Sequence, residues 1–507
     1  MTADLLAPLD LAFWNIESDR HPMHLGALGV FSAHSPTAGA HAADLLAARA
    51  AAVPGLRMRI RDVWQPRGGG GGAPPAPPPP GPPPPPPRGP PPPPPRAPPP
   101  RRAAGPPPAA RRPPRPGAGP GRRMRIRDVG QPLAFGGAAR ETDPDFDPLN
   151  HVRLHAPTAD FHAVAGRLME RPLERGRPPW EAHVLPGEDG VSFAVLFKFH
   201  HALADGLRAL KLAAGVMDPL DLPERTPRSI EPSRPMLALP DVRRVPELVR
   251  GALSDVGRAL DIGASVALSA LGVSSSSALK STPTGTRSIA GVDLDIDDVH
   301  RVRKAVGGTV NDVLIAVVAG ALRRWLEERG DGTDGVAPRA LIPVSKRRPR
   351  TATPQGNRLS GYLIRLPVDN PDPLARLDRV RTAMVRNKDA GPNRGAGAVA
   401  LLADHVPALG HRLGGPLVGQ AARLWFDILV TSVPLPGLGL RLGGDPLTAV
   451  YPLAPLAPGQ SLAVAISTYR NQVHYGLVAD ASAVPDLDVL ARAVTDEVDS
   501  LIAVCDQ

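Results

Sequence analysis

Cysteine is nearly absent from this sequence, whose single cysteine, Cys505, lies close to the C-terminal end. One cysteine cannot build an intrachain disulfide framework or a CxxC zinc site, so a reducing cytosol is the compartment we expect. No stretch of about 20 strongly apolar residues occurs, which argues against a transmembrane helix. The first residues, MTADLLAPLDLAFW, carry no basic segment followed by an apolar run, so we expect no signal peptide.

Several catalytic signatures are also missing. The sequence contains no GxSxG nucleophile elbow, no GxxxxGKS/T phosphate loop and no HExxH metal motif. His151 and His155 have the spacing of a helix-borne metal pair, but without an HExxH context they do not predict a metal site. We therefore expect no metal and no resident cofactor.

Acidic residues are missing from one segment in particular. The formal net charge is +10, from 59 basic and 49 acidic residues, and residues 67–123 contain ten arginines and no acid. Outside that segment, basic and acidic residues are equal in number. The high charge therefore belongs to one segment rather than to a binding face, and we expect no nucleic-acid partner.

The same segment, residues 67–123, consists almost entirely of Pro, Gly, Ala and Arg. Such a composition cannot bury enough apolar surface to offset chain entropy, so we expect an extended, disordered, polyproline-rich insert. The hexapeptide MRIRDV stands on both sides of it, at 58–63 and at 124–129. A duplication interrupting one domain explains this pattern, with either copy completing the fold. The alternative is a ligand for proline-binding modules.

The most informative stretch is 191–210, VSFAVLFKFHHALADGLRAL. Apolar residues at every odd position from 191 to 199, with a mixed set between them, predict a strand with one fully buried face. The strand leads into His200 and His201, and a run of helical composition follows Gly206. Neighbouring residues in an extended chain point to opposite faces, so we expect only one of the two histidines to face a substrate. Two satisfied core histidines are the simpler explanation for the pair taken alone.

A second polar group stands at the start of a buried helix. Thr309 and Asp312 have the spacing of a capping box, ahead of a run that is apolar on all sides from 313 to 322. Helix capping explains Asp312 but leaves Asn311 without a reason, which makes Asn311 a candidate site residue. Periodicity also predicts a helix near 298–306, a packing helix over 247–271, strands at 340–344, 359–368 and 425–433, a hairpin of 461–468 with 472–478, and a closing helix from Leu487.

The heptapeptide HHALADG, from His200 to Gly206, resembles the HHxxxDG signature of the CoA-dependent acyltransferase superfamily, which includes chloramphenicol acetyltransferase and peptide-synthetase condensation domains. Six further stretches resemble the bacterial wax ester synthase/diacylglycerol acyltransferase family. They are PLDLAFW, HPMHLGAL, RPPWE, TVNDVLIAVVAGALRRWL, GNRLSGYLIRLP and VYPLAPLAPGQSLAVAISTY. In order and spacing the seven stretches cover nearly the whole chain outside residues 67–123.

This resemblance implies roles for individual residues. His201 is expected to be the general base and His200 its buried support, while Asp205 is structural and Gly206 serves the turn. Asn311, Asp312 and Ser432 are expected at the substrate site. We also consider the cluster that follows a predicted strand end, Lys346, Arg347 and Arg348, as a contact for the phosphates of CoA; a solvated basic loop explains it equally well.

The resemblance also implies an α/β fold with two chloramphenicol-acetyltransferase-like subdomains and a tunnel between them. The N-terminal subdomain is expected at 1–66 and 124–219, the crossover linker with its helix at 220–290, and the C-terminal subdomain at 291–507. Two departures concern the stretch usually written VTNVPGP, in which Ser432 replaces asparagine and Leu435 replaces glycine. These departures bear on the choice of acceptor and on the level of activity.

The function expected from this resemblance is acyl-CoA-dependent formation of triacylglycerol from diacylglycerol, with wax esters from long-chain alcohols as a further product. Acyl-CoA is then a co-substrate, and a peripheral position at the inner membrane face or on lipid inclusions is expected because the substrates lie there. One alternative is a condensation-type acyltransferase that uses carrier-bound thioesters. The other is a degenerate, non-catalytic relative that acts through its polyproline segment.

Overall fold

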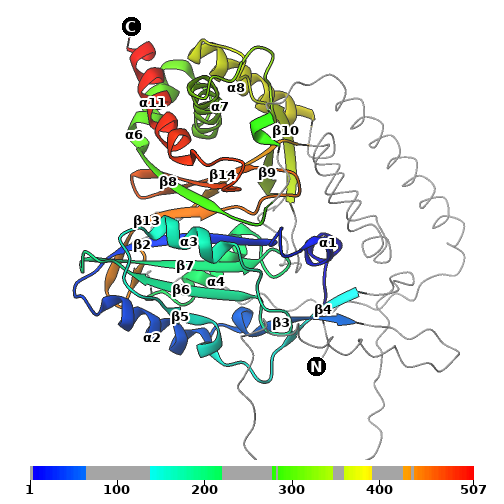
Figure 1. Cartoon of the computed structure of the whole chain (residues 1–507), viewed down its shortest axis with the longest axis vertical. Helices are drawn as coiled ribbons and strands as arrows, with labels where there is room; N and C mark the ends of the chain where they lie inside the picture. The colour runs from blue at the N-terminus through cyan, green and yellow to red at the C-terminus, as the bar shows by residue number, and fades with distance from the viewer. Residues whose placement is uncertain are drawn as a thin grey trace, which may run out of the picture. The chain divides into compact units, whose positions relative to one another are not determined.

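The computed structural model describes residues 4–63, 137–219, 277–280, 284–345, 359–390, 426–435 and 439–506. These residues form two six-stranded sheets and one three-stranded sheet with helices packed on them (Figure 1). This confirms the predicted α/β class with mixed sheets and packed helices. The insert, the second MRIRDV copy and the helix expected at 247–271 lie outside the described residues.

The first sheet carries the motif histidines and has the strand order β12-β13-β2-β7-β6-β5. Its central strands, β2 and β7, pair antiparallel over their full lengths, with His24 opposite His200. Helices α2 and α4 pack on one face of the sheet and α3 packs on the other. The elements are β2 (His24–Ser32), α2 (Ala38–Ala50), β5 (Val152–Leu154), α3 (Phe161–Met169), β6 (Trp180–Pro186), β7 (Ser192–His200), α4 (Gly206–Ala214), β12 (Arg441–Leu442) and β13 (Asp445–Leu453).

Strand β7 confirms the strand predicted before the two histidines, but both of its faces are buried from Phe193 to His200. The second face is covered because α3 packs against it. Lys198, on that face, is only 1% exposed, and its ammonium group donates to the carbonyl oxygens of Leu168 and Arg171 at 2.8 and 3.0 Å. A cation in this place satisfies carbonyl groups at the end of α3 that have no partner within the helix.

The second sheet has the strand order β10-β9-β11-β14-β15-β8. Helices α6, α7, α8 and α11 share one hydrophobic core with it, and Figure 1 shows them together on one side of the sheet. The elements are β8 (Ser288–Asp295), α6 (Ile296–Val306), α7 (Val310–Glu328), β9 (Arg339–Ser345), β10 (Leu359–Arg365), α8 (Pro373–Ala390), β11 (Ile428–Pro434), β14 (Leu462–Tyr469), β15 (Gln472–Ala479) and α11 (Leu487–Cys505).

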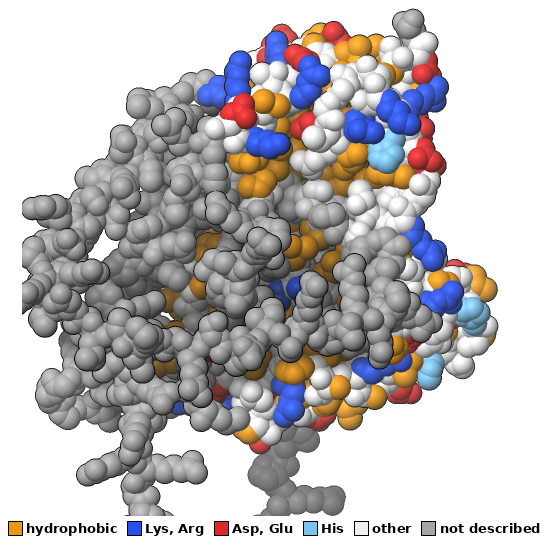
Figure 2. Space-filling view, turned by 180° about the vertical axis from the view of Figure 1, so that it is seen from behind, with side chains coloured by type: hydrophobic (Ala, Val, Ile, Leu, Met, Phe, Trp, Pro, Cys, Tyr) orange, Lys and Arg blue, Asp and Glu red, His pale blue; other side chains and the backbone are white. Residues whose placement is uncertain are grey.

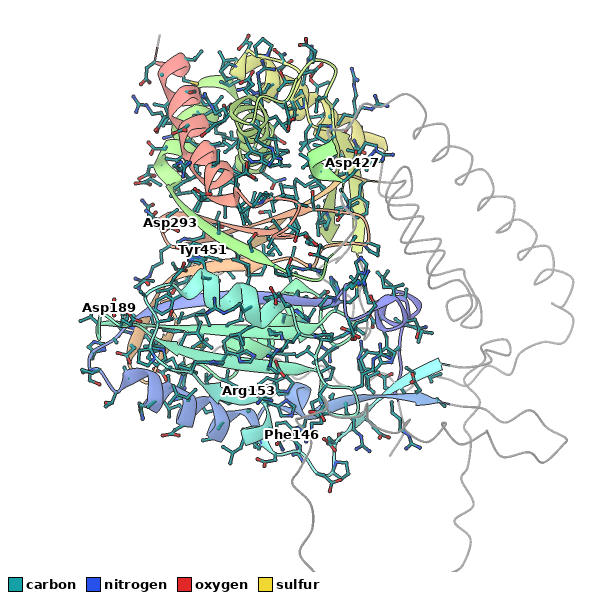
Figure 3. All side chains as sticks on the ribbon, in the orientation of Figure 1. Phe146, Arg153, Asp189, Asp293, Asp427 and Tyr451 are labelled. Atoms are coloured by element: carbon teal, nitrogen blue, oxygen red, sulfur yellow. The ribbon has the colours of Figure 1, made fainter. Side chains whose placement is uncertain are left out.

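Strand β13 joins the two halves of the chain. It lies after β11 in the sequence, yet it pairs antiparallel with β2 in the first sheet. The hydroxyl of its Tyr451 donates to the carboxylate of Asp293 on β8 at 2.9 Å, and Figure 3 shows these two side chains close together. A division of the chain at residue 291 would therefore cut the first sheet, because β12 and β13 come after that residue.

A small third sheet consists of β1 (Asp4–Leu5), β4 (Gly137–Thr142) and β3 (Met58–Val63), in that order. β3 is the first MRIRDV copy, and it pairs antiparallel with β4. Helix α1 (Pro8–Ile16) packs against this sheet through Leu11 and Trp14. It comes from the PLDLAFW stretch and reaches the turn that carries the motif histidines.

Candidate active site

His201 follows the last residue of β7 and lines an apolar cavity. Its backbone N–H donates to the carbonyl oxygen of Met23 at 2.8 Å, which ties the turn to the start of β2. The imidazole stacks on the ring of Phe13 from α1, with 4.1 Å between the ring centroids and 24° between the ring planes. Phe13 therefore covers one face of the imidazole and restricts how the ring can turn.

The surroundings of His201 favour its neutral form. Burial lowers the pKa of His201 to about 4, although a hydrogen bond to its own backbone raises it. In that bond one ring N–H donates to the backbone oxygen, which favours one tautomer of the neutral ring. A neutral imidazole with a fixed tautomer can remove a proton from a hydroxyl group.

His200 points to the other side of the sheet and is only 1% exposed. Its Nδ1 accepts a hydrogen bond from the backbone N–H of Ala202 at 3.0 Å, so the ring proton resides on Nε2. That Nε2 lies 3.4 Å from Oε1 of Glu17, and the edge of the Trp14 indole packs against the ring at 4.9 Å. His200 is thus held inside the protein rather than presented to the cavity.

Glu17 connects α1 to the turn. Its Oε1 also accepts the backbone N–H of Met23 at 3.2 Å, while Arg175 lies 3.5 Å from its Oε2. Burial by itself would raise the pKa of the Glu17 carboxyl, but the contacts with His200, the Met23 N–H and the Arg175 guanidinium outweigh it and lower the pKa. A carboxylate at this point fixes both the tautomer of His200 and the start of β2.

A buried ion pair supports the same turn. Arg140 of β4 donates to Oδ2 of Asp10 and to the carbonyl oxygen of Ala202, each at 2.6 Å. Arg140 and Asp10 are 3% and 0% exposed, so removal of either partner would leave a buried charge. The residue after the two histidines is therefore anchored by the small third sheet and by α1.

The two remaining motif residues open α4. Asp205 is the N-cap, and its carboxylate accepts the backbone N–H of Arg208 at 2.8 Å, as a structural role requires. Gly206 does not adopt a positive φ, and an added Cβ would lie 3.7 Å from Val433, an ordinary contact. The turn itself does not require glycine here. Gly206 lines the cavity, and its missing side chain leaves room beside His201.

The cavity occupies about 180 Å³ and runs between elements of both sheets. Its walls come from β2, β7, α4 and β13 on one side and from β9, β11 and β14 on the other. Apart from His201, its polar side chains among the described residues are Thr431 and Ser467. The Ser467 hydroxyl already donates to the carbonyl oxygen of Val450 at 2.6 Å. An apolar cavity with few polar groups is typical of sites for apolar ligands.

Strand β11 brings the VTSVP stretch to this cavity. Thr431 and Val433 line it, and Ser432 lies between them on the strand. Because alternate residues of a strand face opposite sides, the side chain of Ser432 is directed to the face that carries Val430. Val430 belongs to the core shared with the helices α6, α7, α8 and α11.

Asn311 and Asp312 lie in the first turn of α7, and neither belongs to the described residues that line the cavity. The predicted capping box is confirmed: the backbone N–H of Thr309 donates to Oδ2 of Asp312 at 2.8 Å, and the Thr309 hydroxyl accepts the N–H of Asp312 at 3.2 Å. Asn311 is half-buried. The basic cluster Lys346, Arg347 and Arg348 lies outside the described residues.

The described part of the chain offers neither a metal cluster nor a single membrane-spanning helix. No group of three acidic, histidine or cysteine side chains there could hold a metal ion. No single helix there is long and apolar enough to cross a membrane; α6 and α7 meet the length and composition criteria only as a pair bent by 100°. On the face drawn in Figure 2, basic and acidic side chains are interspersed with hydrophobic ones.

Sequence reasoning did not find Phe13, Glu17, Arg140 or Thr431 as site residues. Phe13 lies within PLDLAFW, and Glu17 lies three residues beyond that stretch. A motif match does not reveal that either residue contacts the histidines. Arg140 lies in a strand that no pattern predicted, beyond the insert. The VTSVP stretch was the only available signal for Thr431.

Family models match most of the chain. The wax ester synthase/diacylglycerol acyltransferase catalytic domain matches residues 6–68 and 118–314, and the C-terminal domain of the same family matches residues 355–502. Two relatives come from Mycobacterium tuberculosis (strain ATCC 25618 / H37Rv). The probable diacylglycerol O-acyltransferase tgs1 is 30% identical over 406 residues, 76% of this chain and 84% of its own length. The probable diacylglycerol O-acyltransferase tgs2 is 31% identical over 384 residues, which make up 70% of this chain and 82% of its own length.

Solved structures show the same fold. The wax ester synthase/diacylglycerol acyltransferase from Marinobacter aquaeolei VT8 has a TM-score of 0.63 at 19% identity, covering 99% of this chain and 100% of its own. The TRI3 trichothecene 15-O-acetyltransferase from Fusarium sporotrichioides has a TM-score of 0.53 at 10% identity. The match covers 98% of this chain and 94% of the TRI3 chain. The family models and the mycobacterial relatives settle the family. The chain belongs to the wax ester synthase/diacylglycerol acyltransferase family.

Proposed function

We propose that the protein transfers a fatty acyl group from acyl-CoA to the hydroxyl of diacylglycerol, which yields triacylglycerol and free CoA. Long-chain alcohols are a second class of acceptor and yield wax esters. The observation that carries the proposal is a neutral histidine, His201, on the wall of an otherwise apolar cavity. The names of the two mycobacterial relatives support diacylglycerol as the acceptor.

The reaction proceeds in one transfer without an acyl-enzyme. The imidazole of His201 takes the hydroxyl proton as the alcohol oxygen attacks the thioester carbonyl carbon. A carbon–oxygen bond forms and the carbon–sulfur bond breaks. The CoA thiolate then receives the proton from the imidazolium, so His201 returns to its neutral form. Burial keeps the resting imidazole neutral and favours the return of the proton to the CoA thiolate, while it weakens the ring as a base in the first half of the transfer.

Other residues are proposed to contact the two substrates or to support such contacts. Asn311 is proposed to contact the thioester. Asp312 supports Asn311 by capping α7, and Ser432 affects acceptor choice through the packing of β11. Lys346, Arg347 and Arg348 are proposed to contact the phosphates of CoA. Thr431, which lines the cavity, is a further candidate for a hydrogen bond to the thioester carbonyl.

The proposed substrates also suggest where the protein works. Diacylglycerol and triacylglycerol partition into membranes and lipid inclusions, so we propose a peripheral position at the inner membrane face or on such inclusions. Binding to vesicles that contain diacylglycerol, measured by flotation with and without the lipid, tests this part separately.

The central experiment supplies purified protein with palmitoyl-CoA and dioleoylglycerol and measures triacylglycerol and free CoA. The two products should form in equal amounts. The change His201→Gln should lower the rate by roughly 10²–10⁴-fold, the usual contribution of a general base. The matched control is His300→Gln on the surface of α6, which should retain the wild-type rate. Full activity in His201→Gln would overturn the mechanism.

Two alternatives predict different results in the same assay. A condensation-type enzyme would use a carrier-bound thioester and leave free acyl-CoA unchanged. A non-catalytic relative would form no ester from either donor.

Deletion of residues 67–123 tests the role of the insert, since intact transfer by the shortened protein would make that segment dispensable for the chemistry.

A further inference from the structure

Two successive aromatic residues of α1 contact the two successive histidines of the motif turn. The ring of Phe13 stacks on the imidazole of His201, with 4.1 Å between the ring centroids and 24° between the ring planes. The indole of Trp14 instead meets the His200 ring at 68°, with 4.9 Å between the centroids. Phe13 therefore presents the face of its ring to the histidine that lines the cavity.

The face of an aromatic ring distinguishes a neutral partner from a charged one. Its π electrons give the face a partial negative charge, and a cation within about 6 Å of the ring centroid is attracted to it. His201 is neutral at rest, because burial lowers its pKa to about 4. It becomes a cation only while it carries the proton of the acceptor hydroxyl. The stack on Phe13 is thus strengthened at the stage of the transfer at which the imidazole is charged.

The surroundings of His201 make this charge costly. The cavity that it lines is largely apolar, so an imidazolium there is poorly solvated. Among the neighbouring groups, the charge of Asp205 favours the protonated ring and that of His200 opposes it. A cation in such a place gains more from an aromatic face than an exposed cation does.

The carboxylates of α1 and of the residue that follows it face other partners. Asp10 forms the buried ion pair with Arg140 at 2.6 Å. Oε1 of Glu17 lies 3.4 Å from Nε2 of His200. The contact that α1 makes with the ring of His201 is the uncharged phenyl ring of Phe13.

We propose that the ring face of Phe13 stabilises the imidazolium form of His201 during acyl transfer. This rests on the function proposed above. Phe13 is not among the described residues that line the cavity, so it acts through His201, as a positioning residue. An interaction that is stronger in the transition state than in the ground state raises kcat, whereas one that is equal in both states lowers KM. The effect of Phe13 should therefore be on kcat.

Loss of the aromatic face should slow the transfer. Phe13→Leu keeps an apolar side chain at this position but removes the π electrons. With palmitoyl-CoA and dioleoylglycerol we expect kcat to fall by about 10–30-fold and KM to change little, because that range corresponds to about 1.4–2 kcal/mol, the strength of a desolvated cation–π contact. Steady-state kinetics with varied palmitoyl-CoA separates the two constants.

Fluorination of the ring separates its charge from its shape. Monofluoro-, difluoro-, trifluoro- and pentafluorophenylalanine, incorporated in place of Phe13, withdraw electrons from the ring face with little change in size. The logarithm of kcat should fall stepwise along this series, and the pentafluoro variant should be at least as slow as Phe13→Leu. A level series would show that the ring contributes packing alone and would overturn the proposal, as would a change confined to KM.

Phe146 provides the matched control. Its ring also packs against a histidine, His151, with 5.2 Å between the centroids and 31° between the planes, and neither residue is among the described residues that line the cavity. Phe146→Leu, and pentafluorophenylalanine in place of Phe146, should leave kcat at the wild-type value. An equal fall of kcat in the control variants would attribute the loss at Phe13 to a weakened fold and so contradict the assignment.

Failure of the proposed function has a separate signature, since the wild-type protein would then form no ester from acyl-CoA and any alcohol. The contact can still be measured without turnover. NMR of protein with 15N-labelled histidine gives the protonated fraction of His201 at about pH 4.5, and the signal that is lost in His201→Gln identifies the residue. Pentafluorophenylalanine in place of Phe13 should lower this fraction. Equal fractions in the two proteins would refute the electrostatic role whether or not ester is formed.

Discussion

Gly291 of β8 and Gly476 of β15 stand directly opposite each other in the second sheet. An added Cβ at Gly476 would lie 1.9 Å from the carbonyl oxygen of Pro452, and one at Gly291 would lie 2.6 Å from the Tyr451 ring. Because neither glycine has a side chain, β13 packs directly against the backbone of β8 and β15. Two sheets can approach so closely only where neither strand presents a side chain.

A side chain at that contact should separate the sheets. We expect Gly476→Ala to lower the free energy of unfolding by at least about 1–3 kcal/mol, the usual cost of overpacking, because the conflict is with backbone rather than with a movable side chain. Urea denaturation followed by circular dichroism measures this loss. Gly332→Ala is the control, since nothing lies within 4 Å of its added Cβ, and a loss as large in the control would contradict the argument.

The contact between Glu17 and His200 leads to a prediction about rate. Glu17→Gln removes the anionic acceptor for the proton on His200 while it preserves shape. We expect kcat to fall by about tenfold, equivalent to about 1.4 kcal/mol, with little change in KM, because the turn that places His201 loses a fixed neighbour. Steady-state kinetics with varied acyl-CoA separates the two constants. A change confined to KM would instead place Glu17 at substrate binding.

The pH dependence of the reaction follows from the environment of His201. Burial lowers its pKa to about 4, so the neutral, basic form persists well below the pH at which an ordinary histidine is protonated. We expect kcat/KM to stay level from neutral pH down to about pH 5 and to fall toward pH 4. Initial rates over this range, with protein returned to neutral pH to check recovery, provide the test. A midpoint near that of an ordinary histidine would show that another group limits the rate.

Acid should also weaken the fold through buried histidines. Burial lowers the pKa values of His24 and His183, and the charge of Lys198 lowers both further. The unfolded state therefore binds more protons than the folded state below the ordinary histidine pKa. Stability is complete above about pH 6.5 and falls, as the pH drops from there, by about 1.4 kcal/mol per pH unit for each such proton.

The comparison of wild type with His24→Gln checks this linkage. Glutamine can still donate to the carbonyl oxygen of Met169, the partner of His24 at 2.9 Å, but it does not titrate. Urea midpoints at about pH 7.5 and about pH 5.5 should differ less in the variant than in the wild-type protein. Equal differences would show that His24 contributes nothing to the acid sensitivity.

The sequence alone was sufficient to predict the secondary-structure elements that follow a strong local residue pattern. The strand before His200, the capping box at Thr309 and the hairpin through Arg470 and Asn471 all follow patterns set by neighbouring residues. The hairpin turn includes Arg470 at φ 54°, the single non-glycine positive φ among the described residues. Local chemistry decided each of these elements, so no knowledge of distant partners was needed.

Contacts between distant segments could not be predicted in this way. Glu17 and His200 are 183 positions apart, and Arg140 reaches Asp10 across the insert. The residue pattern of strand β13 is that of an ordinary strand, and this pattern does not indicate which sheet the strand joins. The buried second face of β7 was missed for the same reason, because a side chain such as Lys198 looks exposed until the carbonyl groups that it satisfies are known.

The order of synthesis gives the position of β13 a further consequence. Domains generally fold from the N-terminus as the chain emerges, but the first sheet keeps an unpaired edge at β2 until residues 445–453 have been made. A prematurely terminated chain would therefore expose an apolar strand edge that invites association with other chains. It would also lack the wall that Leu447 and Val450 contribute to the cavity. Interrupted translation should thus give aggregates rather than partly active fragments.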